Sequence, residues 1–183
     1  PALMLGGYEV MVFDANQQRR RLLQAVEGYL ILDMTEQALE SLRRIVDPGP
    51  DRFSYYMLQG EVWRARREHH RALEWFQQAH ELAPQDLDVL MAMAWCFKRT
   101  DRLDLSIDTM RQAYQFHATT PVVLYNLACY YSLAGNKEQA LSWLGRALRL
   151  NRSRGKLISD ETDFDPLRGD PDFQHLLELV AEE

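Results

Sequence analysis

Several classes of protein are excluded by what this chain of 183 residues contains in small amounts. Glycine and proline number only 9 and 7, too few for a typical all-β or loop-rich fold. Two cysteines do not make a disulfide framework, so we expect a reducing compartment, the cytoplasm. Wholly apolar runs are far shorter than the roughly 20 residues of a spanning helix, which argues against membrane insertion. The net charge of −6 offers no basic face, so we expect no nucleic-acid partner.

A period of 34 residues is the main feature that the chain does have. Aromatic residues recur at this spacing, as Tyr29, Trp63, Phe97 and Tyr131. Small residues recur at the same spacing, as Ala38, Ala72, Ser106 and Ala140, and large apolar ones as Leu42, Phe76, Met110 and Leu144. Independent columns that agree on one period indicate tandem structural repeats.

Each repeat has the pattern of two helices. In residues 53–86, Tyr56, Gly60 and Trp63 fall on one helical face, and Ala72 and Phe76 fall on a second. All seven prolines stand at the boundaries of the predicted helices and none in a helix interior, so their missing N–H groups interrupt no helical hydrogen bond. A single helix pair cannot bury both of its apolar faces, so consecutive pairs must stack. The pattern therefore predicts an all-α solenoid.

These columns resemble the tetratricopeptide repeat (TPR), whose signature is a set of large, small and aromatic residues at fixed offsets. Residues 53–86 match best, with Gln59 the only departure, and Val26 makes residues 19–52 the weakest match. The other two repeats are residues 87–120 and 121–154. The resemblance implies a right-handed superhelix of antiparallel helix pairs. Its first helices would line a concave groove that binds a peptide or a partner protein, without catalysis or a cofactor.

The C-terminal residues 155–183 are similar to segments that close repeat arrays in bacterial proteins. Asp170 and Pro171 have the character of a helix cap and a first helical residue. The helix that follows has Phe173, Leu176 and Leu177 on one face. We expect it to cover the exposed apolar end of the fourth repeat, a structural rather than a binding role.

The family's groove positions can be carried over to this sequence one residue at a time. They give Leu23, Glu27 and Leu30 in the first repeat, and Met57, Glu61 and Arg64 in the second. The third repeat supplies Met91, Trp95, Lys98 and Arg99, and the fourth supplies Val122, Tyr125, Asn126 and Cys129.

Two chemical features of these positions suggest how a partner is held. Met and aromatic side chains, at Met57, Met91, Trp95 and Tyr125, would form an adaptable apolar floor, or would merely pack neighbouring helices. Arg64, Lys98 and Arg99 would receive an acidic group, unless Arg64 is satisfied by Glu61 three residues before it. The hypothesis is a peptide across repeats two to four, with apolar anchors and at least one acid.

Residues that sometimes carry catalysis or bind metals form no recognisable site here. His69 and His70 are adjacent in a predicted turn, point apart and lack a third metal ligand. Cys96 and Cys129 are interpreted as small apolar packing residues rather than a redox pair. No phosphate-binding glycine loop or nucleophile elbow is present. We therefore expect no enzyme, no metal and no cofactor.

The N-terminal residues 1–18 are too apolar for an idle tail, and three interpretations stay open. The segment packs on the first repeat, fills a groove of its own or a neighbouring chain, or is left over from cloning. Because the chain starts at Pro1, a targeting segment that has been removed is also compatible with the sequence. We favour packing, with a helix from about residue 8. The leading functional hypothesis is an adaptor or assembly factor. The alternative is a scaffold that self-associates as a homo-oligomer through this N-terminal segment.

Overall fold

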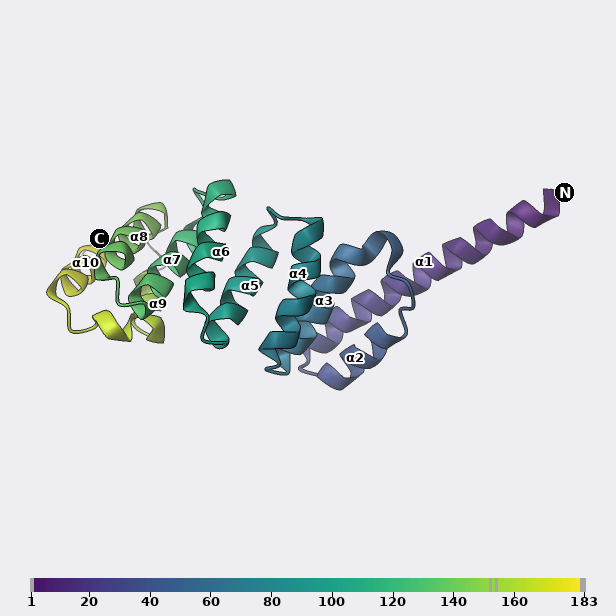
Figure 1. The fold of residues 1–183 in the computed structure, drawn as a ribbon, viewed down its shortest axis with the longest axis horizontal. Helices are drawn as coiled ribbons and strands as arrows, with labels where there is room; N and C mark the ends of the chain where they lie inside the picture. Colours follow the sequence, from purple (N-terminus) through teal and green to yellow (C-terminus); the bar gives the residue numbers. More distant parts are fainter. Residues whose placement is uncertain (1, 152, 154, 182–183) are drawn as a thin grey trace. The chain divides into compact units, whose positions relative to one another are not determined.

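The computed structural model describes residues 2–151, 153 and 155–181, with side chains from residue 15 onward except those of 157, 180 and 181. The helices before residue 84 are α1 (Ala2–Ile31), α2 (Thr35–Arg43), the 3-10 helix η1 (Gly49–Asp51), α3 (Arg52–Ala65) and α4 (His69–Leu82). Those that follow are α5 (Leu87–Arg99), α6 (Leu103–Phe116), α7 (Pro121–Leu133), α8 (Lys137–Leu150), α9 (Gly155–Ile158), η3 (Thr162–Leu167) and α10 (Pro171–Ala181). Because the described residues hold helices and no strand (Figure 1), the prediction of an all-α fold is confirmed.

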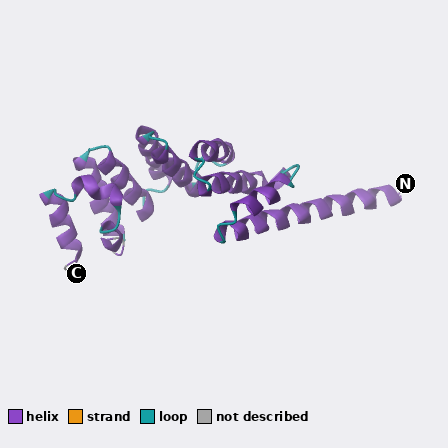
Figure 2. Ribbon diagram, turned by 90° about the horizontal axis from the view of Figure 1, so that it is seen from below, coloured by secondary structure: helices purple, strands orange, loops and turns teal. Residues whose placement is uncertain are grey.

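The chain divides into two compact halves, Pro1–Ala83 and Pro84–Glu183. In the N-terminal half, α1 pairs with α2 and α3 pairs with α4. In the C-terminal half, α5 pairs with α6 and α7 pairs with α8, and α9, η3 and α10 follow. The connections within these pairs are short loops (Figure 2). The boundaries of the four repeats themselves stay a prediction.

The first helix differs from the expectation for the N-terminal segment. The backbone is helical from Ala2 through Ile31, not from about residue 8. Its partner α2 has 9 residues against 30 in α1, so α2 can cover only part of the length of α1. Figure 1 shows the N-terminal turns of α1 extending past α2 and α3 of the same half.

The small residues of the 34-residue period lie where the two helices of each pair meet. Ala38, Ala72, Ser106 and Ala140 are all fully buried. The Ser106 hydroxyl donates a hydrogen bond of 2.9 Å to the carbonyl oxygen of Ala94 on the facing helix α5. A hydroxyl can reach a facing backbone carbonyl only where the helices approach closely, which explains why this column excludes large side chains.

Gly60 on α3 approaches the ring of Phe76 on α4 closely. A Cβ atom placed on Gly60 would lie 2.3 Å from a ring carbon of Phe76, a separation that real Cβ atoms do not reach. In the first helix pair, Val26 stands at the position equivalent to Gly60, and Leu42 stands at the position equivalent to Phe76. Both side chains are fully buried. A larger residue on one helix is therefore matched by a smaller one on the other, which accounts for the departure at Val26.

The turn inside each helix pair contains one residue with a positive φ angle, and this residue also recurs every 34 positions. Asp33, Arg67, Asp101 and Gly135 have φ values of 55°, 62°, 57° and 72°, and each stands 34 residues after the last. Glycine adopts this conformation without strain, and aspartate tolerates it better than most residues. The turn geometry is thus preserved even where glycine is absent.

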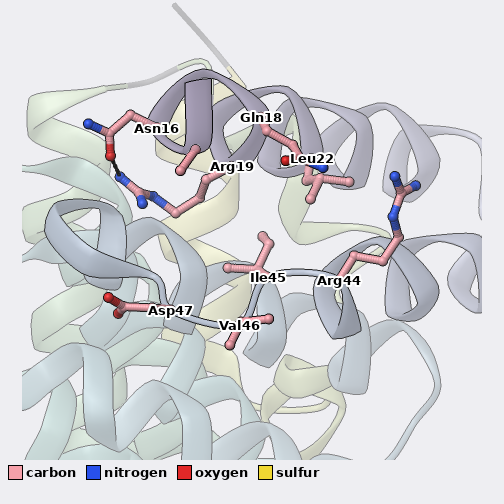
Figure 3. Close-up of a pocket in the computed structure, with 9 residues that line it drawn as sticks. Asn16, Gln18, Arg19, Leu22, Arg44, Ile45, Val46 and Asp47 are labelled. Atoms are coloured by element: carbon pink, nitrogen blue, oxygen red, sulfur yellow. Dashed lines mark hydrogen bonds between the residues drawn. The ribbon is translucent and has the colours of Figure 1, made fainter. Parts of the chain in front are cut away.

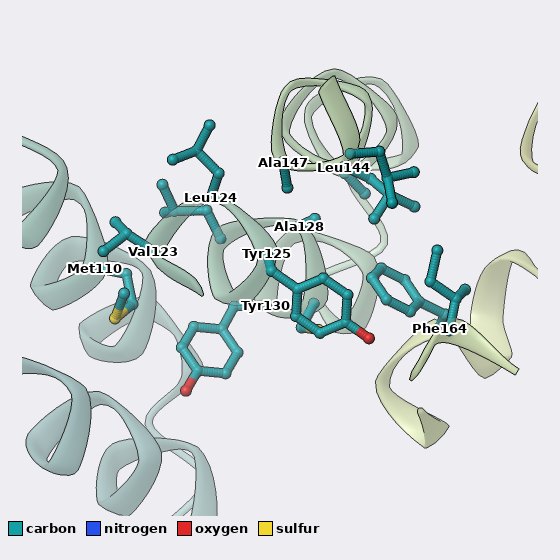
Figure 4. Close-up of a cluster of buried hydrophobic side chains, with 14 of the residues drawn as sticks. Met110, Val123, Leu124, Tyr125, Ala128, Tyr130, Leu144, Ala147 and Phe164 are labelled. Carbon is teal, nitrogen blue, oxygen red and sulfur yellow. The ribbon is translucent and has the colours of Figure 1, made fainter. Parts of the chain in front are cut away.

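The C-terminal segment packs on the last helix pair. The 3-10 helix η3 lies against α7, and α10 lies against α8. Phe164 and Phe173 are fully buried in the same cluster as Leu144 and Ala147 (Figure 4). The Asp170 carboxylate accepts a 2.9 Å hydrogen bond from the Asp172 N–H group and so caps α10, as its position before Pro171 predicted.

An ion pair joins the start of α10 to the start of α8. Lys137 Nζ lies 2.6 Å from Asp170 and 2.7 Å from Asp172. The hydrogen bond that Lys137 donates to the Asp170 carboxylate raises the pKa of Lys137 and lowers the pKa of Asp170. Both groups are therefore charged at neutral pH and hold α10 against the last repeat pair.

Gly60→Ala is expected to lower the free energy of unfolding by about 2 kcal/mol, since the new methyl group must displace the Phe76 ring from a packed core. Adding Phe76→Leu should recover part of that loss, because the smaller side chain makes room. Urea unfolding of the two single variants and the double variant measures this coupling. Purely additive effects would contradict the steric explanation.

Candidate functional site

In the N-terminal half, the predicted groove residues include one ion pair. Arg64 Nε donates a 2.9 Å hydrogen bond to Glu61 Oε2, so the pairing that their spacing allowed is confirmed. Met57 is partly buried on the same helix, α3, and Glu27 is exposed on α1. Leu23 was expected to line the groove, but it is only 6% exposed and belongs to the core. The Arg64 cation is thus already engaged within its own helix.

In the C-terminal half, α5 supplies four of the predicted residues. The Arg99 guanidinium carbon lies 5.0 Å from the centre of the Trp95 ring, a cation–π contact. Arg99 is exposed, Trp95 is partly buried, and Met91 packs against the core cluster at its edge. Asn126, on α7, is also partly buried. This half therefore presents a cation held over an aromatic ring.

Lys98, the last of the four predicted groove residues on α5 to be described, is paired with the C-terminal segment. Its Nζ atom lies 2.6 Å from Asp163 Oδ2, and the two side chains are only 17% and 12% exposed. The Lys98 ammonium group also lies 5.6 Å from the centre of the Tyr130 ring. The predicted basic position is therefore occupied by an acid of the same chain, 65 residues further on.

Among the predicted residues, Leu30 and Val122 are partly buried, whereas Tyr125 and Cys129 on α7 are buried. Tyr125 and Cys129 are 5% and 2% exposed. The Tyr125 ring meets the Phe164 ring edge-to-face, with centroids 5.6 Å apart and planes at 86° (Figure 4). Phe164 in turn lies 5.7 Å from Phe173. Instead of forming an open floor, these groove positions of α7 are covered by η3.

Sequence reasoning missed Asp163 and Phe164 as partners of the groove positions. It assigned the tail to the end of the fourth repeat, whereas η3 lies on α7 itself. Two signals were available in the sequence: an acid followed by an aromatic residue in the tail, and a basic residue at a groove position of the third repeat. Their complementary chemistry could have suggested the contact, but no spacing rule relates them.

Burial also changes the chemistry of Cys129. Removal from water raises the pKa of its thiol, and the nearby Glu161 and Asp163 carboxylates raise it further. Cys96 and Cys129 are both buried, as expected for small apolar packing residues. A thiol of this kind is a poor nucleophile, so its environment favours packing over chemistry.

The described part of the N-terminal half is hollowed in places. One hollow of about 410 Å³ lies between α1 and the loop after α2, and Figure 3 shows Arg19, Leu22, Ile45 and Val46 around it. Arg19 there donates to Asn16 at 2.7 Å, and its Nε donates to Asp51 at 2.7 Å. A second hollow of about 320 Å³ includes Trp63 and Trp75. Neither is lined by a predicted groove residue.

The described part of the chain contains no group of three or more His, Cys, Asp or Glu side chains placed to hold a metal ion. None of the helices in that part combines the length and the apolar character that crossing a membrane requires.

The comparison with known families decides the class of this protein. The family model described as tetratricopeptide repeat matches residues 6–158, most of the chain. The chain belongs to the tetratricopeptide repeat family. The TPR fold is a general protein–protein interaction module, and its members are generally not catalysts. No curated protein sequence matches this chain.

Solved TPR structures share its fold. PilF of Pseudomonas aeruginosa is 21% identical, with a TM-score of 0.73 over 92% of this chain and 78% of PilF. A crystal structure of MamA is 17% identical, with a TM-score of 0.68 over 81% of this chain and 87% of MamA. At these identities the likeness concerns the fold alone, and it shows the α-solenoid of helix pairs that the period predicted.

Cys96 and Cys129 are expected to resist alkylation at pH 8 in the folded TPR chain, because both thiols are buried and the pKa of Cys129 is raised. In guanidinium chloride both should react at the rate of a free thiol. Mass spectrometry after timed exposure to iodoacetamide follows each site separately. Rapid labelling of either cysteine in the native chain would contradict the packing.

Proposed function

We propose that this protein is a non-catalytic adaptor or assembly factor that binds a peptide segment of a partner protein at its first-helix positions. The coarse part, a protein-interaction module, follows from the family. The finer part is supported by the character of those positions, which combine Met and aromatic side chains with one exposed cation, Arg99. Met side chains adapt to different partners, and aromatic ones anchor them.

One observation carries this proposal. Groove positions of the C-terminal half already hold a segment of polypeptide, through Lys98 with Asp163 and Tyr125 with Phe164. These contacts are an acid on a cation and an apolar anchor on an aromatic ring, the same ligand chemistry that the sequence suggested. The side chains at these positions are therefore chemically able to retain an acidic, aromatic segment.

The part of this half that reaches solvent includes Trp95 and Arg99. The Trp95 ring fixes the guanidinium of Arg99, which lowers the entropy lost when an acidic group binds it. Arg64 in the other half is a weaker candidate, because Glu61 already neutralises it. We therefore expect Trp95 and Arg99 to be the main contact residues for a partner peptide, with Met91 and Asn126 beside them.

The test uses a peptide selected for binding to the immobilised chain. Arg99→Gln and Trp95→Leu should each lower the affinity for this peptide by about tenfold, or about 1.4 kcal/mol. The loss has a charge component for Arg99 and an apolar-contact component for Trp95. Fluorescence anisotropy with the labelled peptide measures the affinity. Arg149→Gln, which removes an exposed arginine from α8, is the matched control and should leave affinity unchanged. Equal affinities for all four chains would sink this assignment.

Self-association is the second candidate function, and two observations favour it. The helix α1 is far longer than its partner α2. Apolar side chains of the N-terminal half are exposed, with Ile31 at 85%, Leu32 at 67% and Val46 at 97%. Helical backbone without a partner and exposed apolar side chains both favour association with a second copy.

If the N-terminal turns of α1 join two copies, deleting residues 1–13 should convert a stable oligomer into a monomer. Multi-angle light scattering over a wide concentration range measures the mass of both chains. An adaptor predicts instead a monomer before and after the deletion. A full-length chain that is monomeric at every concentration would rule out the scaffold.

A further inference from the structure

The contact between η3 and α7 has the make-up of a ligand in a binding site. Two adjacent residues of one 3-10 turn carry it, Asp163 and Phe164. Asp163 reaches Lys98 on α5, and Phe164 reaches Tyr125 on α7. Both partners are positions that the sequence assigned to a groove for peptides. An acid followed directly by an aromatic residue is therefore recognised by a cation on one first helix and a ring on the next.

The segment that carries these two residues is held in shape by hydrogen bonds among its own residues. Arg168 donates to the carbonyl oxygens of Ser159 at 2.9 Å and Glu161 at 3.1 Å, and to the Asp165 carboxylate at 2.7 Å. The Glu161 carboxylate accepts from the Asp163 N–H group at 3.2 Å. The loop thus satisfies many of its polar groups internally. Such a preorganised loop loses little conformational entropy on docking, and it can leave the groove as a unit.

The Lys98–Asp163 pair is not what stability alone requires. Taking two charges out of water is costly, and an apolar pair of similar size is often as stable or more so. A buried pair does, however, select one partner and one register, because a wrong partner leaves a charge unpaired. An ion pair at this contact therefore favours specific recognition over simple closure of the repeat array.

We propose that the Asp163–Phe164 pair is an intramolecular ligand of this groove, and that partner proteins with an acidic residue followed by an aromatic residue bind by replacing it. This inference rests on the proposed peptide-binding function and names its partner class. The segment is tethered to α8, so its effective concentration at the groove is of order millimolar. A partner must compete with it, and the apparent affinity falls by the fraction of chains in which the groove is open.

A synthetic peptide of residues 158–169 with a fluorescent label is the probe for this competition. We compare the full-length wild type, Asp163→Asn, and Asp163→Asn combined with Lys98→Met. The first substitution removes the charge that holds the internal segment but leaves the groove intact, so the probe should bind about tenfold more tightly than to the wild type. The second removes the groove cation and should abolish that gain.

The control probe carries Asn and Ala in place of the acid and the aromatic residue, and it should bind none of the three chains. Equal affinity of the first probe for wild type and Asp163→Asn would overturn the proposal. So would binding that survives Lys98→Met, or equal binding of the control probe. Circular dichroism of each variant establishes that the chain is folded.

Thiol labelling tests the opening of the segment without any added peptide. Cys129 is buried on α7, the helix against which η3 packs, so departure of the segment should uncover this thiol. Alkylation of Cys129 should be about tenfold faster in Asp163→Asn than in the wild type, with Cys96 unchanged. Equal rates for both cysteines in every chain would mean that the segment opens only on global unfolding, which contradicts the proposal.

The adaptor site and the internal ligand are distinguished by separate outcomes. If Cys129 stays protected but the affinity of a selected peptide depends on Trp95 and Arg99, the groove binds partners and the proposal of an internal ligand is wrong. If no selected peptide depends on those residues, the proposed adaptor site is wrong, whatever the labelling rates are.

Discussion

The close approach of two helices over small side chains is the constraint on which the rest of this structure depends. Gly60 faces the ring of Phe76 with no room for a Cβ atom, and the Ser106 hydroxyl reaches the backbone of the facing helix. Close packing of this kind fixes how each second helix lies on its first. It also leaves the far side of each first helix uncovered by its own partner. That side must be covered by a neighbouring pair, by another segment of the chain, or by a bound protein.

In the C-terminal half, the chain itself covers part of that side. The segment around Phe164 buries the aromatic face of α7, while Asp163 neutralises Lys98. Burying an ion pair costs desolvation energy that an apolar contact would not, so this contact does more than close the helix pair with apolar surface. Under the proposed function, structural closure and peptide recognition would use the same positions.

The sequence predicted the helices well because their signals are local and repeated. The small column at Ala72 and its equivalents, the prolines at the first position of α7 and α10, and the cap at Asp170 all depend on residues that are near neighbours in the chain. The pairing of Glu61 with Arg64 was foreseen for the same reason, since three residues apart on a helix means adjacent in space. The start of α1 was placed too late, because the apolar residues before Tyr8 carry no cap or period that marks a helix end.

By itself, then, the sequence determined that the chain forms stacked helix pairs of the tetratricopeptide repeat family, since one period recurs through most of its length. Only the tertiary structure decided which groove positions face solvent. Lys98 and Asp163 are 65 residues apart, and no periodicity relates the repeats to the segment that follows them. Whether a cation meets water, a partner or its own chain depends on where that segment returns. Packing of the whole C-terminal half sets this return path, and no local pattern encodes it.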